Sequence, residues 1–141
     1  TSINGCIATR GAPSDYDEWS AMGAAGWSWN TALPYFRKLE RDLNFDGELH
    51  GKDGPFAISR FPVSDWSGFV RAVADSLQKR GYPLIADQNG EWRDGVMPTS
   101  VSVNEKQERV SCALVYLNRL VRARRNLTIM TRSFVRRIVF E

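Results

Sequence analysis

The sequence contains few of the residues on which catalysis and metal binding most often depend. Its 141 residues include only two cysteines and one histidine. Cys6 and Cys112 form no CxxC pair and no metal-ligand spacing, so two buried free thiols are the default interpretation and a disulfide is the unsupported alternative. His50 stands alone in a polar, glycine-rich loop, which is more typical of a surface residue than of a catalytic base. Residue types alone therefore identify no catalytic residue and no metal ligand.

Motifs of several enzyme classes are also missing. The sequence has no GxSxG elbow, no HExxH, no GxxxxGK[ST] loop and no GxGxxG after a predicted strand. Gly23 and Gly26 lie between two predicted helices, which does not fit the strand–turn–helix setting of a dinucleotide-binding loop. These absences argue against a triad hydrolase, a zinc protease and a P-loop nucleotidase.

Long apolar runs and targeting signals are absent as well. No stretch approaches the roughly 20 apolar residues that span a bilayer, and no basic start leads into an apolar run. The sequence thus predicts no membrane span and, without a secretion signal, a cytoplasmic protein. It begins with Thr1 rather than Met, which we interpret as an internal segment of a longer protein. Five Trp, seven Phe and four Tyr indicate a folded chain, because disordered chains are poor in these residues.

The net charge of +3 is small, but the positive charge is gathered in the C-terminal third. The arginines there are Arg109, Arg119, Arg122, Arg124, Arg125, Arg132, Arg136 and Arg137. Such a cluster fits either contact with nucleic acid or an anionic cofactor, or a solvated helix face and helix C-terminus. No nucleic-acid-binding motif accompanies the arginines, so the second interpretation is preferred.

Hydrophobic spacing and turn residues predict an α+β chain. We expect helices over 14–22, from 29 or 30 with apolar spacing to 43, over 66–80 and over 108–124. We expect strands over 56–62, 96–103, 127–131 and 135–140. Ser14, Ser28 and Asp65 are the expected N-caps, while Gly23 and Gly81 are the expected helix stops. The polar, glycine-rich stretch 44–55 predicts a surface loop.

Longer patterns carry more information than single residues. Thr1-Ser2-Ile3-Asn4-Gly5, Thr9-Arg10-Gly11, Asp15-Tyr16-Asp17-Glu18-Trp19, Gly26-Trp27-Ser28-Trp29 and Leu33-Pro34-Tyr35-Phe36 follow one another in fixed order. This run closely resembles the first signature of the glucose-methanol-choline (GMC) family of flavoprotein oxidoreductases. Weaker similarity continues at 87–90, at 109–117 and in the stretches that begin at Asn126 and Val135.

The resemblance implies a fold class: an α+β fragment of a two-domain FAD-dependent oxidoreductase, with part of the FAD domain and part of the substrate-binding domain. Residues 1–45 would form a flavin-contacting loop and a helix pair. Residues 46–105 would belong to the substrate-side domain. Residues 106–141 would be a helix and strands that return to the FAD-binding domain.

The resemblance also implies a cofactor site. Residues Thr1, Ser2, Asn4 and Gly5 match the family loop that runs along FAD, and Val135 matches a strand valine whose backbone contacts the adenine end. Some family members attach the flavin covalently through a histidine at the position of Ile3, so FAD would be bound non-covalently here. Arg10 matches a family arginine that we interpret as structural. Turn and core roles are the plain alternatives for Asn4-Gly5 and for Val135.

The activity that the resemblance implies is hydride transfer from an alcohol, of choline dehydrogenase or alcohol oxidase type, to flavin. The family's dinucleotide fingerprint and its catalytic histidine pair match nothing in this sequence, so we expect the chain alone to be inactive. Its partners would be a small-molecule alcohol and the rest of the parent polypeptide, without nucleic acid. A non-catalytic, stand-alone binding or interaction domain is the first alternative, and a nucleic-acid binder is the second. The aromatic spacing disfavours both, because neither accounts for it.

Overall fold

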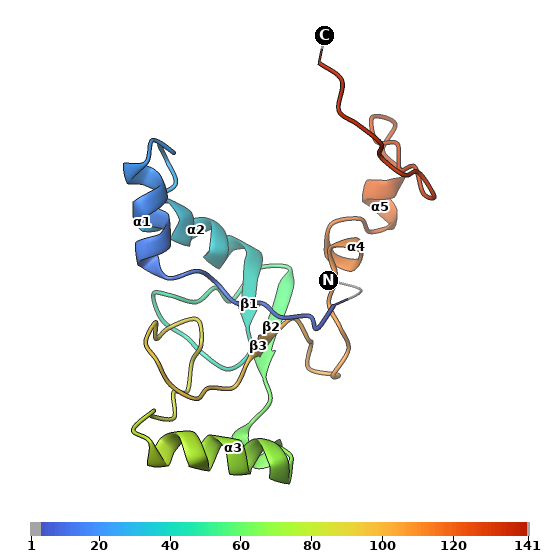
Figure 1. Ribbon diagram of the computed structural model, residues 1–141. Coiled ribbons are helices and arrows are strands. Elements are labelled where there is room, and N and C mark those ends of the chain that lie inside the picture. The colour runs from blue at the N-terminus through green and yellow to red at the C-terminus, as the bar shows by residue number, and fades with distance from the viewer. Residues whose placement is uncertain (1–3, 141) are drawn as a thin grey trace.

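The computed structural model describes residues 4–140 and has an α+β architecture, as expected (Figure 1). In chain order its elements are α1 (Pro13–Ala21), α2 (Trp29–Leu39), β1 (Glu40–Asp42), β2 (Phe56–Arg60), a 3₁₀ turn η1 (Val63–Asp65), α3 (Gly68–Lys79), β3 (Ser100–Val101), α4 (Cys112–Val115) and α5 (Arg119–Arg122). None of the helices described is long and apolar enough to cross a membrane.

A small mixed sheet in the order β1-β2-β3 connects distant parts of the chain. β1 pairs with β2 in parallel, and β2 pairs with β3 in antiparallel fashion. The N-terminal segment adds to the free side of β3 through an antiparallel bridge between Ile7 and Val101. Figure 1 shows α1 and α2 at one end of this sheet and α3 at the other. Residues on both sides of the predicted boundary at 45 thus share one sheet.

Aromatic side chains hold the predicted helix pair together. The ring of Tyr16 on α1 lies 5.4 Å from Trp19, 5.6 Å from Trp29 and 5.6 Å from Phe36, measured between ring centroids. The Asp17 carboxylate accepts a hydrogen bond of 2.9 Å from the Trp29 N–H, which caps the start of α2. The aromatic spacing of the signature therefore builds the contact between the two helices.

The helix boundaries differ from the predicted ones where another side chain provides the cap. α1 begins at Pro13, and the Asp15 carboxylate accepts from the Ala12 N–H at 2.7 Å, so Ser14 is not the cap. α3 begins at Gly68 because the Ser67 hydroxyl accepts from the Val70 N–H, whereas Asp65 lies in the 3₁₀ turn. Both predicted stops are confirmed, since Gly23 and Gly81 have φ of 105° and 95°.

The expected continuation of α2 to residue 43 is wrong. The helix ends at Leu39, and Glu40–Asp42 form strand β1 instead. Glu40 and Asp42 alternate into the interior while Arg41 lies half-buried between them, which is the two-residue period of a strand. Partners that are distant in sequence thus decide the conformation of these three residues.

The C-terminal third departs most from the expectation. The helix predicted over 108–124 is replaced by α4 and α5, because the Asn118 side chain accepts from the N–H groups of Leu120 and Val121 and starts a new helix. The strand predicted over 96–103 is reduced to β3. No helix or strand lies within the described residues 123–140, so the strands predicted over 127–131 and 135–140 are wrong for this chain. This segment projects away from the sheet (Figure 1), and a strand requires a neighbouring strand.

Among the described residues, buried polar and charged side chains are more numerous than buried hydrophobic ones. The buried apolar residues include Ala57, Ile58, Ile85 and Val101. Beside them, ten polar or charged side chains are buried: Arg10, Glu40, Asp42, His50, Arg60, Asp87, Asn89, Ser100, Ser102 and Ser111. Buried charges are costly unless they are paired, so these side chains are expected to contact one another.

Candidate functional site

The predicted flavin-contacting residues divide between described and undescribed parts of the chain. Thr1 and Ser2 lie outside the described residues, whereas Asn4 and Gly5 are exposed at the start of a segment that runs beside β3. The Ala8 N–H donates to the Ser100 C=O at 2.8 Å, and the Cys6 C=O accepts from the Ser102 N–H at 2.7 Å. These bonds fix the main chain and leave the side chain of Asn4 at the surface.

Val135 is not brought together with Asn4 and Gly5. It is 79% exposed and lies in the C-terminal segment that leaves the sheet (Figure 1). The two cysteines are free thiols, as expected, but Cys6 is half-buried and Cys112 is exposed, so the expectation of two buried thiols is wrong.

The N-terminal segment enters the interior at Arg10. Its guanidinium group donates to the Leu49 C=O at 2.6 Å and forms an ion pair with the Glu40 carboxylate. It also lies over the Phe36 ring, with 5.4 Å between the guanidinium carbon and the ring centroid. This burial agrees with the structural role expected for Arg10.

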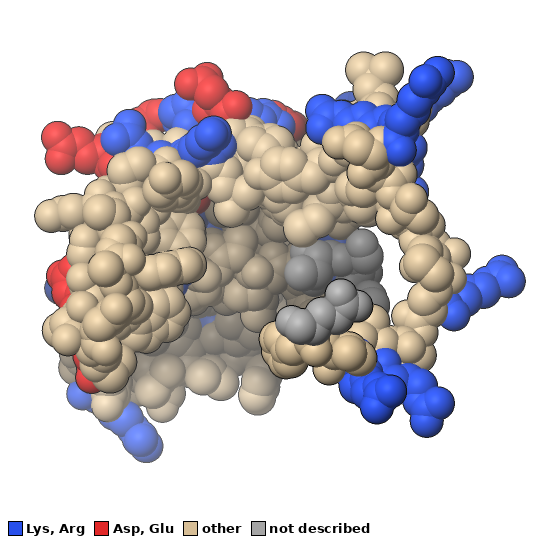
Figure 2. Space-filling model, turned by 90° about the horizontal axis from the view of Figure 1, so that it is seen from above, with Lys and Arg blue, Asp and Glu red and all other residues tan. Residues whose placement is uncertain are grey.

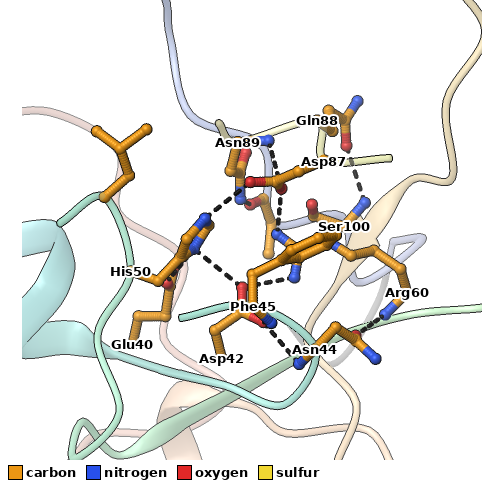
Figure 3. A network of polar contacts seen from close by, with 12 residues as sticks. Glu40, Asp42, Asn44, Phe45, His50, Arg60, Asp87, Gln88, Asn89 and Ser100 are labelled. Atoms are coloured by element: carbon orange, nitrogen blue, oxygen red, sulfur yellow. Dashed lines mark hydrogen bonds and ion pairs between the residues drawn. The ribbon is translucent and has the colours of Figure 1, made fainter. Parts of the chain in front are cut away.

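His50 occupies the centre of the buried charges, and the expectation of a surface histidine is wrong because only 5% of it is exposed. Its Nδ1 lies 3.0 Å from Glu40 Oε1 and 3.1 Å from Asp42 Oδ2, while its Nε2 lies 2.7 Å from Asp87 Oδ2 (Figure 3). An ionised carboxylate can accept hydrogen bonds but cannot donate them, so each ring nitrogen that bonds to one must carry a proton. The geometry therefore requires an imidazolium ion.

The surroundings of His50 account for that charge. Burial by itself would lower the pKa of His50, but hydrogen bonds to Asp42, Asp87 and Glu40 outweigh it and raise this pKa to about 10. The same bonds act on the acids. Burial would raise the pKa of Asp42 and of Asp87, yet hydrogen bonds from His50, together with Arg60, hold both pKa values below the ordinary value of an aspartate.

Arg60 on β2 completes the network. Its Nη1 lies 2.5 Å from Asp42 Oδ2 and its Nη2 lies 2.8 Å from Asp87 Oδ1. The Phe45 ring covers it, with 4.8 Å between the guanidinium carbon and the ring centroid. Two backbone N–H groups, of Asn44 and Phe45, donate to the other oxygen of Asp42 at 2.8 and 2.9 Å. The carboxylate of Asp42 is therefore satisfied at both oxygens.

The network is balanced in charge when His50 is protonated. The three acids are Glu40, Asp42 and Asp87, and the three cations are Arg10, Arg60 and His50. Removal of any one member would leave an unpaired buried charge, which costs about 3–5 kcal/mol.

The same cluster resembles a metal site in composition, although the sequence had no metal-ligand spacing. Ligand atoms of Glu40, Asp42 and His50 all lie within 4.8 Å of one another. However, a histidine ligand must be neutral, and here both nitrogens already face carboxylates. The two acids of the cluster are also paired with arginines, Glu40 with Arg10 and Asp42 with Arg60. We therefore describe the cluster as an ion-pair network.

Asn89 joins this network to the N-terminal segment. It is fully buried, and its side-chain amide donates to the Ala8 C=O at 3.0 Å while its Oδ1 accepts from the Arg10 N–H at 3.0 Å. Its own N–H donates to Asp87 Oδ1 at 3.1 Å. The side chain of Asn89 thus forms hydrogen bonds with backbone groups of Ala8 and Arg10, the two neighbours of Thr9.

Sequence reasoning missed most of this network. Glu40 and Asp42 were included in a helix, and Arg60 was an ordinary strand residue. The stretch 87–90 is singled out in the sequence only by its family resemblance, which does not indicate the ion pair that Asp87 makes with His50. The alternation of Glu40 and Asp42 after the end of an amphipathic helix was the one local signal that could have indicated buried acids on a strand.

Comparisons with known proteins agree with the sequence resemblance. The family model for GMC oxidoreductases matches residues 1–141. The chain is 43% identical over 140 residues to 5-(hydroxymethyl)furfural oxidase from a Methylovorus species, covering 99% of this chain and 26% of that protein. It is 35% identical over 141 residues to an oxygen-dependent choline dehydrogenase from Photobacterium profundum, covering 100% of this chain and 24% of that protein.

Structural comparison gives the same result. The crystal structure of pyridoxine 4-oxidase from Mesorbium loti matches 91% of this chain with a TM-score of 0.78 and 31% sequence identity, over 25% of that protein. The chain thus spans about a quarter of the length of the curated relatives that it matches. Because the family model covers the whole sequence and the fold agrees, the chain belongs to the GMC oxidoreductase family.

Proposed function

We propose that this chain is a segment of an FAD-dependent alcohol oxidoreductase and that it forms one wall of the flavin site. The observation that carries the proposal is the family match over all 141 residues, which includes the signature loop at Asn4 and Gly5. When bound, FAD supplies the hydride acceptor that protein side chains lack. The role of this chain is to bind and orient the cofactor.

The described residues fit that role. The amide side chain of Asn4 has no hydrogen-bond partner among residues 4–140, and both Asn4 and Gly5 are exposed. The main chain behind them is held by the Arg109 guanidinium, which donates to the Asn4 C=O, and by the bridge at Ile7. An exposed amide on a fixed backbone can donate to and accept from a polar ring system. Thr1, Ser2 and Val135 remain part of the proposed site on the resemblance alone.

Non-covalent attachment belongs to the same proposal, because the isoleucine at position 3 cannot form a bond to flavin. The division into 1–45, 46–105 and 106–141 is proposed likewise. The end of the third part, beyond α5, leaves the sheet (Figure 1), as a segment that returns to another domain would do.

Exposed apolar side chains favour a segment of a larger protein over a stand-alone domain. Trp27, Tyr35, Leu120, Phe134 and Phe140 are all exposed, several of them nearly completely. Trp27 and Tyr35 line one hollow, and soluble monomers rarely expose large contiguous apolar patches. We propose that the rest of the parent polypeptide covers them.

The basic C-terminal third fits the same view. Figure 2 shows Lys and Arg side chains, in blue, on the side of the molecule where the C-terminal segment projects, away from most acidic groups. Only a salt-sensitive affinity for DNA or RNA would favour the nucleic-acid alternative.

The names of the relatives indicate a class of alcohol. The relatives' names suggest two classes of substrate, a hydroxymethyl compound and choline, and identity is higher to the first, at 43% against 35%. We therefore propose a primary alcohol, with 5-(hydroxymethyl)furfural as the first compound to test.

The experiment is a cofactor analysis of the full-length parent protein with a matched pair of variants. Heat or acid denaturation should release free FAD, and Asn4→Ala should reduce the FAD content of the purified protein. The control is Asn30→Ala, which removes an exposed asparagine from α2. A parent protein without flavin, or one whose flavin stays with the precipitated polypeptide, would contradict the proposed cofactor or its non-covalent attachment, respectively.

A further inference from the structure

We propose that Asn89 and the ion-pair network around His50 form a clamp that positions residues 4–11 against the flavin, with Asn89 as the positioning residue that joins the two. This inference rests on the proposed function, because it assigns a role to residues beside the proposed flavin segment. It adds residues that make no contact with the cofactor themselves.

The first reason is that the N-terminal segment has little apolar anchoring. Residues 4, 5, 7 and 9 are exposed, and Ile7, the largest apolar side chain among residues 4–9, is 64% exposed. Among the described residues, the segment's backbone hydrogen bonds to β3 and the adjoining Ser102 are made by Cys6 and Ala8. Polar contacts must therefore fix the position of the segment, and the strongest of them converge on Arg10.

The second reason is the geometry of Asn89. One buried side chain satisfies two backbone groups of the segment, the Ala8 C=O and the Arg10 N–H, both at 3.0 Å across about eighty residues of sequence. A second contact runs in parallel, since Gln88 Oε1 accepts from the Thr9 hydroxyl at 3.1 Å and from the Ser100 N–H at 2.8 Å. The turn at 87–89 thus holds both the segment and β3.

The third reason is that the turn is itself locked to the buried ions. Asp87 accepts from the Asn89 N–H, from Arg60 and from His50. On the other side, His50 pairs with Glu40, which also holds Arg10. The contacts form a closed circuit from Arg10 through Glu40, His50, Asp87 and Asn89 back to the Arg10 N–H. Figure 3 shows Glu40, His50, Asp87 and Asn89 of this circuit.

A closed circuit of buried, charged hydrogen bonds restricts the movement of the segment that it includes. The flavin segment cannot shift without breaking a contact that leaves a buried polar group unpaired. Because β1 and β2 carry Glu40 and Arg60, the clamp fixes the flavin segment relative to the sheet. Asn89 is the positioning residue because, among residues 4–140, only its side chain is hydrogen-bonded to the backbone of both Ala8 and Arg10.

The test uses the full-length holoenzyme and compares Asn89→Ala with Gln78→Ala. Gln78 is the matched control because it also loses a side-chain amide, one that donates to the Ala74 C=O on α3, far from the segment. We expect Asn89→Ala to weaken flavin affinity about tenfold or more. We also expect it to change the visible circular dichroism of the remaining bound flavin, while Gln78→Ala alters neither. A merely structural role would lower the folded fraction without changing the flavin spectrum of the folded molecules.

Two further measurements cover the case in which Asn89→Ala does not fold. Arg10→Lys keeps the charge but loses the two-pronged contact to Leu49 and Glu40, and it should shift the flavin spectrum in the same way. Hydrogen exchange of the unaltered holoenzyme should show the Arg10 amide protected as strongly as those of β2. Wild-type flavin affinity and spectrum in Asn89→Ala or in Arg10→Lys, or fast exchange at Arg10, would overturn the clamp while leaving the proposed function intact. A wild-type parent protein without flavin would overturn both.

Discussion

The Nε2 atom of His50 lies 2.7 Å from Oδ2 of Asp87, although 37 residues separate them in the sequence. On its other side the same ring contacts Glu40 and Asp42. The histidine is therefore a cation shared by three acids in the interior. Several measurable properties of the protein depend on that arrangement.

Stability should fall as the pH rises through the neutral and alkaline range. Folding raises the pKa of His50 from 6.5 to about 10, so between these values the folded protein holds a proton that the unfolded chain has lost. The contribution of His50 is complete below pH 6.5 and is lost as the pH approaches 10. The expected slope is on the order of 1 kcal/mol per pH unit.

Urea unfolding of the parent protein at pH 6, 7, 8 and 9 measures this slope, with His50→Gln as the comparison. The wild type should lose more stability than the variant over this range. Equal slopes in both proteins would show that His50 is not a buried cation. At acid pH the sign reverses: folding lowers the pKa of Asp42 and of Asp87, so their contribution is lost as the pH falls below the ordinary aspartate range.

Restoring the charge balance should partly rescue the loss of His50. His50→Gln alone leaves the network with one excess negative charge and should cost about 3–5 kcal/mol of unfolding free energy. Adding Asp87→Asn removes that excess, so the double variant should be more stable than the sum of the two single changes, by about 1–3 kcal/mol. Additive effects in this double-mutant cycle would mean that the two side chains do not interact as an ion pair.

The loop that carries His50 should not tolerate a larger residue at position 51. A Cβ atom on Gly51 would lie 1.9 Å from the Arg37 carbonyl oxygen, which belongs to the backbone of α2 and cannot move aside. Gly51→Ala should therefore destabilise the protein by about 1–3 kcal/mol or more. Gly68→Ala is the control, because nothing lies within 4 Å of its Cβ position. Thermal unfolding compares them, and equal midpoints would contradict the packing described for this loop.

Local sequence patterns predicted the helices and strands whose own apolar spacing and turn residues define them. α1, α2, β2 and α3 were expected from apolar spacing and turn residues, and Gly23 and Gly81 end helices as expected. The family signature was readable because aromatic residues at fixed spacing build the contact between α1 and α2. Each of these patterns lies within a short stretch of sequence, so it can be recognised without knowledge of the fold.

The ion-pair network could not be read in the same way. Arg10, Glu40 and Asp87 each look like surface residues in their own stretch of sequence, and only the fold brings them into the network around His50. The C-terminal strands fail for a related reason. Residues 127–131 and 135–140 have the composition of strands, but no strand pairs with them among the described residues.

The central claim is that this chain belongs to an enzyme that passes hydride from an alcohol to FAD. The most direct test is to add 5-(hydroxymethyl)furfural, and choline in parallel, to the full-length protein under anaerobic conditions while recording the visible absorption band of the oxidised flavin. The account predicts that the first alcohol bleaches this band with formation of an aldehyde. A flavin-loaded protein whose absorption is unchanged by either alcohol, and by a wider panel of primary and secondary alcohols, would contradict it.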